Sequence, residues 1–348
     1  MANFRNDADR LALDWGINLP GVTHYVGERG NAYDAAPPAF AATTAANSGI
    51  PAVINTMVDP QLIRQLVAPT KAEEIYGSQK KGDRRNKTIM FPVLESSGYA
   101  VAYGDFEQGG DSSANANWVN RQSFTFQTWA KYGDLESDMM GMGNIDWIAE
   151  QRTAGASVLA KQQNLVDLLG VSGLENYGAL NDPALPVAIA ASVKTGSDTK
   201  WSSTSDPNAI YVDFVTLFAA LNKAMMGNIN NQTRLKTVVP SELSQVMTYT
   251  NSFGITLEDM LKKAWPNMEI VYLPEAGVTM SGGYTSANVM QMFAPEVDGV
   301  ETVTTAFTER LTMHRLEQYS TNARQKMSRG GWGTIWKRPM AVAQMVGI

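Results

Sequence analysis

Few residues in this chain have the types and spacing that chemistry requires. The two histidines, His24 and His314, lie far apart and in no metal-ligand spacing, so we expect hydrogen-bonded structural residues and no zinc site. The chain has no cysteine, which excludes thiolate ligands, thiol nucleophiles and disulfides. GGDSSA at Gly109 lacks the G-x-S-x-G elbow of serine hydrolases, and GMGNID at Gly141 has two of three dinucleotide-loop glycines. The residues therefore indicate no catalytic, cofactor or metal site.

Carboxylate chemistry stays open, because any Asp or Glu pair can converge in space. A glycosidase is thus a remote alternative, with a sugar cleft lined by tryptophans such as Trp118, Trp129, Trp147 and Trp201. No particular carboxylate pair is indicated, and such aromatic side chains are more often core or interface residues.

Two clusters of opposite charge are candidates for an assembly interface. KKGDRRNK holds five basic residues within eight, including Arg84, Arg85 and Lys87, and its simplest interpretation is a solvated turn. DLESD supplies the carboxylates of Asp134, Glu136 and Asp138. We hypothesise that the basic cluster of one subunit meets the acidic cluster of a neighbour, and that Trp118 is a further interface residue.

Composition indicates a folded globular protein of one large domain or two to three smaller ones. The chain has 348 residues, of which 44% are hydrophobic and 18% charged, and its net charge is −6. The negative charge argues against a dedicated nucleic-acid-binding protein. The opening MANFRNDADR does not resemble a signal peptide, and no apolar run is long enough for a membrane helix. We expect a protein that is made and assembled in a cytoplasm.

The first third of the chain has little means of burying its own apolar faces. Short helices are predicted at 60–68, after Asp59, and at 71–77, where Thr70 and Glu73 have capping-box spacing. Residues 87–132 then read as a long out-and-back β-hairpin, with period-2 alternation on the return arm. Arms of 14–16 residues would reach roughly 45–50 Å, whereas a compact chain of this length has a radius of gyration of about 20 Å. We therefore expect the hairpin to project beyond the globular body of its own subunit.

The rest alternates between helices and strands. One long helix is predicted from Asn144, as its cap, to Leu169, before Gly170. Its apolar stripe comprises Gly155, Leu159, Val166 and Leu169, widened by Val158, Leu165 and Leu168.

The segment from 171 to 300 predicts a mixed sheet covered by helices. A strong helix begins at Asp206-Pro207 and stops at Gly227, and RLKTVVP and MEIVYLP read as buried strands. Two short helices, at about 241–250 and 257–264, lie between these strands, and 300–348 is strand-like.

Four segments in order, APTKAEEIYG, YGDFEQGG, GLENYGALNDP and RPMAVAQMVGI, resemble the tailed-bacteriophage major capsid protein family. The resemblance implies an α+β fold of the Hong Kong ninety-seven type, which encapsulin shells share. It divides the chain into an N-terminal arm (1–86), an extended loop (87–132), a peripheral domain with a spine helix (133–184), an axial domain (185–300) and return strands of the peripheral domain (301–348).

The resemblance also explains why the last twenty residues are apolar. They would complete the peripheral domain, with Tyr319, Trp332, Trp336, Met340 and Val342 as candidates to pack beneath the spine helix.

The function implied is structural: a subunit that forms hexamers and pentamers of an icosahedral virion shell and encloses DNA without reading its sequence. Portal, decoration and scaffolding proteins are possible partners, and Met1 favours a scaffold encoded separately. An encapsulin-like cargo shell is the alternative. Some family members link subunits through a loop lysine, but residues 88–130 contain none, so we expect non-covalent contacts or a separate cementing protein.

Overall fold

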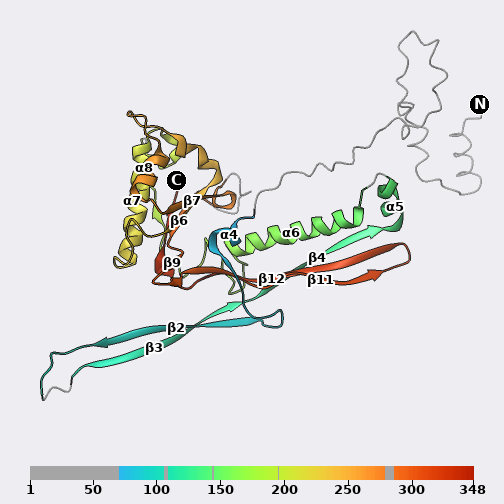
Figure 1. The fold of residues 1–348 in the computed structure, drawn as a ribbon, viewed down its shortest axis with the longest axis horizontal. Helices are drawn as coiled ribbons and strands as arrows, with labels where there is room; N and C mark the ends of the chain where they lie inside the picture. Colours follow the sequence, from blue (N-terminus) through green and yellow to red (C-terminus); the bar gives the residue numbers. More distant parts are fainter. Residues whose placement is uncertain (1–69, 106–108, 143–144, 195, 279–285) are drawn as a thin grey trace, which may run out of the picture. The chain divides into compact units, whose positions relative to one another are not determined.

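The computed structural model describes residues 70–105, 109–142, 145–194, 196–278 and 286–348 (Figure 1). Residues 66–141 and 146–348 form one compact unit. The helix predicted at 60–68 and most of the predicted arm lie outside the described residues.

The described chain contains both helices and strands. The helices are α4 (Ala72–Tyr76), α5 (Asp134–Met142), α6 (Trp147–Leu169), α7 (Pro207–Ala224) and α8 (Leu257–Ala264), with 3₁₀ helices η3 (Trp201–Ser203), η4 (Ser241–Thr248), η5 (Pro274–Ala276) and η6 (Pro339–Ala341). The strands are β1 (Ser78–Lys80), β2 (Thr88–Tyr99), β3 (Asp111–Gln122), β4 (Phe124–Gly133), β5 (Ile189–Ala190), β6 (Leu235–Pro240), β7 (Met268–Leu273), β8 (Val289–Phe293), β9 (Glu296–Val297), β10 (Val300–Glu301), β11 (Val303–Gln318), β12 (Asn322–Trp336) and β13 (Val342–Val346).

A four-stranded sheet in the order β1-β11-β12-β4 carries the long helix α6 on one face (Figure 1). Leu159 of α6 packs with Ala130 of β4 and Met327 of β12. A Cβ at Gly155 would overlap the Met327 methyl group, so the glycine allows the helix to lie close to the sheet. Val158 is 54% exposed, so its predicted place in the apolar stripe is wrong.

The long helix begins two residues later than predicted. Its cap is Asp146, whose Oδ1 accepts a hydrogen bond from Ala149 N at 3.0 Å, whereas the predicted cap, Asn144, lies outside the described residues. An aspartate at this position also favours the positive end of the helix dipole. The predicted end at Gly170 is confirmed, with φ of 69°.

A stretch of glycines in β12 lets other elements approach its backbone. A Cβ at Gly331 would lie 2.5 Å from Gln163 Nε2 of α6. Gly333 has φ of 74° and faces the Tyr177 carbonyl, to which Thr334 N donates at 3.0 Å. Larger residues would push α6 and the segment after it away from the sheet.

The second sheet is five-stranded, in the order β5-β13-β8-β6-β7. The predicted helix at Asp206-Pro207 and both predicted strands are confirmed as α7, β6 and β7. The strand β13 pairs with β8 and β5 here, so the final residues do not all return to the sheet beneath α6, as the 301–348 boundary expected.

Residues 87–132 divide between two sheets. The strands β2 and β3 pair in unbroken register from Thr88–Gln122 to Tyr99–Asp111 and form a sheet of their own. From Phe124 onward the return arm becomes β4 and pairs with β12. The extended hairpin is therefore shorter than predicted, because the alternating residues after Ser123 bury one face beneath α6.

The short helix α4 joins both sheets, but the predicted Thr70–Glu73 capping box is wrong. Ala72 N donates to Asn164 Oδ1 of α6 at 3.0 Å, and Glu73 is held in an ion pair with Arg329 of β12. Tyr76 OH donates to Gln291 Oε1 of β8 at 2.6 Å. Tertiary partners thus replace the local cap.

The aromatic residues of the closing segment have different partners from those expected. Trp336 and Val342 pack in one cluster with Leu168 of α6, as predicted. Trp332 instead packs with Ile89 and Phe91 of the hairpin. The remaining two candidates, Tyr319 (50%) and Met340 (60%), are exposed.

Three polar side chains of α6 are buried, which the apolar-stripe prediction missed. They are Gln163, Asn164 and Asp167. Gln163 Nε2 donates to Asp167 Oδ1 at 2.7 Å, and Thr334 Oγ1 donates to the Asp167 carbonyl. Burial raises the pKa of Asp167 to about 8, with nearby Glu73 adding to the rise while Gln163 and Arg329 oppose it. The folded chain therefore holds a neutral Asp167 at neutral pH.

We predict that Asp167→Asn reduces the pH dependence of stability. The unfolded-state carboxyl ionises near its ordinary pKa of 3.8, whereas the folded one stays neutral to about 8, so wild-type stability falls as pH rises between these values. The variant should match the wild type near pH 4 and melt higher at pH 8 by at least about 2 °C. Differential scanning calorimetry of unassembled subunits at both pH values measures this difference. A variant that melts lower than the wild type at pH 8 would contradict a neutral buried Asp167.

Candidate assembly surfaces

The root of the hairpin, residues 88–91 and 119–122, is fixed to the body by a buried ion pair. Arg121 Nη2 lies 2.8 Å from Asp182 Oδ2, with side chains 7% and 0% exposed, and its guanidinium stacks on Tyr177 at 4.7 Å. Asn176 Nδ2 donates to the Gln122 carbonyl at 3.0 Å. All three partners belong to GLENYGALNDP, so this segment sets where the hairpin begins.

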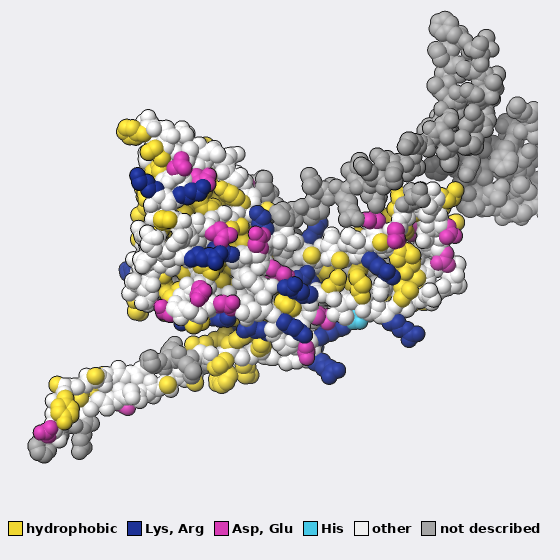
Figure 2. Space-filling view, viewed as in Figure 1, with side chains coloured by type: hydrophobic (Ala, Val, Ile, Leu, Met, Phe, Trp, Pro, Cys, Tyr) yellow, Lys and Arg dark blue, Asp and Glu magenta, His cyan; other side chains and the backbone are white. Residues whose placement is uncertain are grey.

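The hairpin leaves apolar side chains in solvent, both at its root and beyond it. Trp118 of β3 lies opposite Pro92 of β2 and is 59% exposed, and Met90 is 58% exposed. Tyr99 and Tyr103, towards the tip, are 66% and 95% exposed. Figure 2 shows hydrophobic side chains gathered near the root of the hairpin. This exposure makes the hairpin a candidate contact surface.

The basic cluster forms the turn between β1 and β2, which we call the basic turn (residues 80–87). Arg84 contacts its own chain, with Nε 3.9 Å from Glu309 Oε1 and Nη1 3.2 Å from His314 Nε2. Arg85 and Lys87 are exposed and form no ion pair with another described residue. The Lys81 ammonium lies 4.8 Å from the Phe91 ring centroid, and burial, followed by the Lys337 charge, lowers the pKa of Lys81.

The acidic cluster lies on α5, none of whose residues is buried. The three carboxylates, of Asp134, Glu136 and Asp138, are exposed. Within the described chain they contact neither Arg84 nor Arg85, so their pairing between subunits remains a prediction.

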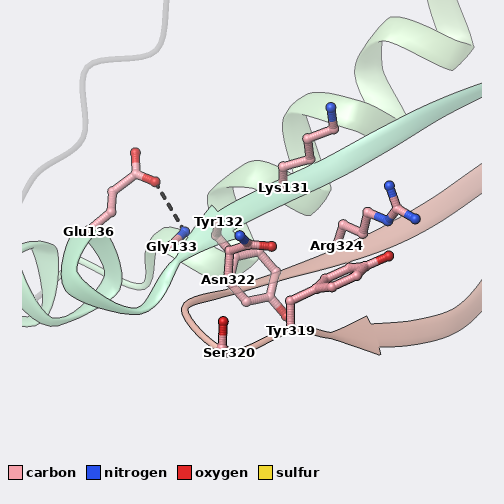
Figure 3. Close-up of a pocket in the computed structure, with 8 residues that line it drawn as sticks. All are labelled: Lys131, Tyr132, Gly133, Glu136, Tyr319, Ser320, Asn322 and Arg324. Atoms are coloured by element: carbon pink, nitrogen blue, oxygen red, sulfur yellow. Dashed lines mark hydrogen bonds between the residues drawn. The ribbon is translucent and has the colours of Figure 1, made fainter.

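A groove of about 690 Å³ lies where β4 ends and the β11–β12 turn begins (Figure 3). We call it the distal groove; it is lined by Lys131, Tyr132, Gly133, Glu136, Tyr319, Ser320, Asn322 and Arg324. Glu136 Oε2 accepts a hydrogen bond from Gly133 N at 3.4 Å, shown dashed in Figure 3.

The cations of the distal groove differ in how firmly they are held. Arg324 Nε donates to Glu317 Oε2 at 2.6 Å, which lowers the pKa of Glu317, and its guanidinium stacks on Trp129 and Tyr319 at 4.7 and 4.9 Å. Lys131 lies directly opposite Arg324 in the sheet but has no ion-pair partner among the described residues. The groove therefore combines an aromatic wall, the Lys131 ammonium and, at the start of α5, the Glu136 carboxylate that accepts from Gly133 N.

One buried cluster has residue types used in catalysis. Lys194 Nζ lies 2.6 Å from Asp213 Oδ2 and 2.5 Å from Ser192 Oγ, and Trp201 Nε1 donates to Asp213 at 2.7 Å. Because Lys194 and Asp213 have fully buried, mutually bonded side chains, the cluster fixes the 191–194 segment to α7. In the described ranges no group of three or more His, Asp or Glu residues is arranged to hold a metal ion. No helix among these residues is long and apolar enough to cross a membrane.

The sequence indicated both charged clusters and Trp118 as candidates, but it did not indicate the residues that fix the root of the hairpin. Arg121 and Asp182 are single charges far apart in sequence, and only the fold brings them together. The distal groove joins residues near 131 and 320 in the same way. The one available signal was an arginine at the end of an otherwise uncharged stretch, ANANWVNRQ.

Several solved structures share this fold, and capsids are among them. The capsid of Myoviridae Phage XM1 matches with a TM-score of 0.68 and 13% identity, over 86% of this chain and 99% of that chain. The capsid of an empty gene transfer agent particle matches at 0.57 and 13% identity, over 90% and 99%. A chain from Gordonia phage Cozz matches at 0.54 and 12% identity, over 84% and 90%. These likenesses confirm the predicted capsid fold.

Comparison of sequences identifies the family. No curated protein sequence matches the chain. A family model of the Pa193 gp26 major capsid protein, however, matches residues 41–347, which is most of its length. The chain therefore belongs to the Pa193 gp26 major capsid protein family and is a structural protein of a phage capsid shell.

Proposed function

We propose that the chain forms hexamers and pentamers of an icosahedral shell around a phage genome, and that its exposed hairpin binds a neighbouring subunit. The observation that carries this proposal is a two-stranded sheet that pairs with no other described strand yet exposes Trp118, Met90 and Tyr99. An isolated two-stranded hairpin is marginally stable in water, so it needs a surface to cover it. In a shell, the neighbouring subunit supplies that surface.

Assembly then couples association to the ordering of the hairpin. The root is held in the free subunit by Arg121, Asp182 and the contact of Trp332 with Phe91. The outer part gains its packing only when it covers a neighbour, so each contact buries apolar area and fixes a strand at the same time. The shell needs no catalytic step for this mechanism.

The proposed shell function implies DNA and other capsid proteins as partners. The shell encloses DNA without sequence-specific contacts, in keeping with a net charge of −6. Scaffolding, portal and decoration proteins are partners of the same assembly, which takes place in the host cytoplasm. An encapsulin-like cargo shell is the alternative, and purified particles that contain an enzyme and no nucleic acid would favour it.

The first prediction that follows from the proposed shell function concerns the outer hairpin. The register places residue 94 opposite residue 116, so excision of 94–116 and closure with Asn-Gly preserves the paired root. We expect the wild type to elute as a megadalton particle and the variant as single subunits or small oligomers. The melting temperature of the variant should equal that of unassembled wild-type subunits. Size-exclusion chromatography with negative-stain microscopy measures both states. Closed particles of normal size from the variant would show that the hairpin is dispensable.

The second prediction concerns the basic turn. We propose that it contacts an acidic surface of a neighbour, for which Asp134, Glu136 and Asp138 are the candidates. An exposed ion pair contributes only about 0–1 kcal/mol, but a shell repeats it at every contact. Arg84→Glu/Arg85→Glu should therefore lower the yield of particles more than it lowers the melting temperature of the subunit, in which Arg84 loses only its contacts with Glu309 and His314.

The matched control is Lys262→Glu/Lys263→Glu on α8, which makes the same change in net charge. Particle yield is measured by light scattering across a series of salt concentrations. If both double variants assemble as the wild type does, with the same salt dependence, the basic turn has no role in assembly.

The third prediction concerns covalent linkage. An isopeptide bond needs a lysine amine near the loop tip, and residues 88–130 contain none. Mature particles boiled in detergent should give one band near 37.9 kDa on a denaturing gel. A ladder of multimers that survives boiling and reducing agent would contradict non-covalent assembly and would direct attention to Lys131.

A further inference from the structure

The helix α5 carries an apolar stripe that nothing in the described chain covers. Leu135, Met139 and Met142 are 72%, 64% and 85% exposed, and their i, i+4, i+7 spacing places them on one face. Asp134 and Asp138, one turn apart, lie along one flank of this stripe. The helix is thus both apolar and acidic, and it has no basic residue in its last turn.

The distal groove has apolar walls and a cation, which complement the apolar and acidic surface of α5. Tyr319, Tyr132 and the aliphatic stem of Lys131 give it apolar walls, and the Lys131 ammonium has no ion-pair partner in the described ranges. Figure 3 shows Lys131 and Arg324 extending on the same side of the sheet, as their direct pairing requires. A volume of about 690 Å³ accommodates several side chains.

We propose that α5 of one subunit docks in the distal groove of a second copy of this chain. Leu135 and Met139 contact its aromatic wall, and Asp134 and Asp138 face Lys131. This inference rests on the proposed shell function and names a second subunit contact, distinct from the hairpin.

The helix cannot occupy the groove of its own chain. No residue separates β4, which ends at Gly133, from α5, which begins at Asp134. Asp134 N donates to the Thr321 carbonyl at 3.1 Å, which ties the helix start to the β11–β12 turn. In this position its apolar stripe stays in solvent although the groove is adjacent. Each copy therefore offers both halves of a head-to-tail contact, which forms a ring when the rotation between successive copies closes.

A cysteine-free chain allows a direct cross-linking test. Met139→Cys and Asn322→Cys are made as separate single variants and co-expressed, so that a disulfide between the two positions can only join different subunits. After mild oxidation of purified particles, we expect a band at about twice 37.9 kDa on a non-reducing denaturing gel. Each variant assembled alone is the matched control and should run as a monomer.

In this arrangement Asp134 and Asp138 face Lys131, so the basic turn would bind a different acidic surface of its neighbour. A second pair of cysteine variants distinguishes the two contacts of α5. Met139→Cys co-assembled with Arg85→Cys should give no dimer. A dimer from that pair, or particles in which the Met139 and Asn322 cysteines do not cross-link, would overturn the docking of α5 in the groove. Absence of particles from the wild type would refute the proposed shell function itself, and this inference with it.

Reversal of charge at Lys131 and Asp138 tests the proposed ion pair between the groove and α5. Lys131→Glu should lower particle yield about tenfold, because it places a carboxylate against Asp134 and Asp138. The double variant Lys131→Glu/Asp138→Lys should restore assembly, and the melting temperature of the free subunit should change little in both. Full assembly of Lys131→Glu, or failure of the double variant to recover, would contradict the predicted pairing.

Discussion

The rest of the structure depends on one constraint. Several other elements must approach closely to a short stretch of β12, residues 329–336. Five residues of this stretch each contact or face a different part of the chain. Arg329 binds α4, Gly331 admits Gln163 of α6, Trp332 packs on the hairpin root, Gly333 faces the Tyr177 carbonyl, and Trp336 contacts Tyr76 and Phe293. The sequence RGGWGTIW contains both glycines and large residues because backbone approach and side-chain packing are both required there.

This arrangement explains which parts could be predicted from the sequence. Elements governed by local signals were correct: the Asp206-Pro207 start of α7, the apolar strands β6 and β7, and the alternation in β4. Errors arose where a tertiary partner replaced a local one. Asn164 of α6 satisfies the first amide of α4 in place of the predicted capping box, and Trp332 packs on the hairpin instead of the spine helix. The distal groove has no local signal, because its walls come from segments about two hundred residues apart.

The same constraint separates what the subunit buries from what it leaves exposed. The junction of α6, β12 and the 173–183 segment fixes the hairpin root through Arg121 and Asp182. Beyond that junction the outer hairpin and α5 keep large apolar side chains in solvent, although the two cores of the body are tightly packed. A subunit with a well-fixed body and uncovered projections suits a shell, where neighbours differ slightly in angle but each must be bound. The Asp167 carboxyl, neutral beneath α4, adds a dependence on pH to the body itself.

The central claim is that the outer hairpin is uncovered in the free subunit and buried by a neighbour in the shell. Hydrogen–deuterium exchange of the amides of residues 92–105 and 109–118, compared between unassembled subunits and purified particles, tests it most directly. The account predicts rapid exchange in the free subunit, since a two-stranded sheet opens readily, and strong protection in particles. The body, including 329–336, should be protected in both states. Equal exchange of the hairpin in particles and free subunits would contradict the account.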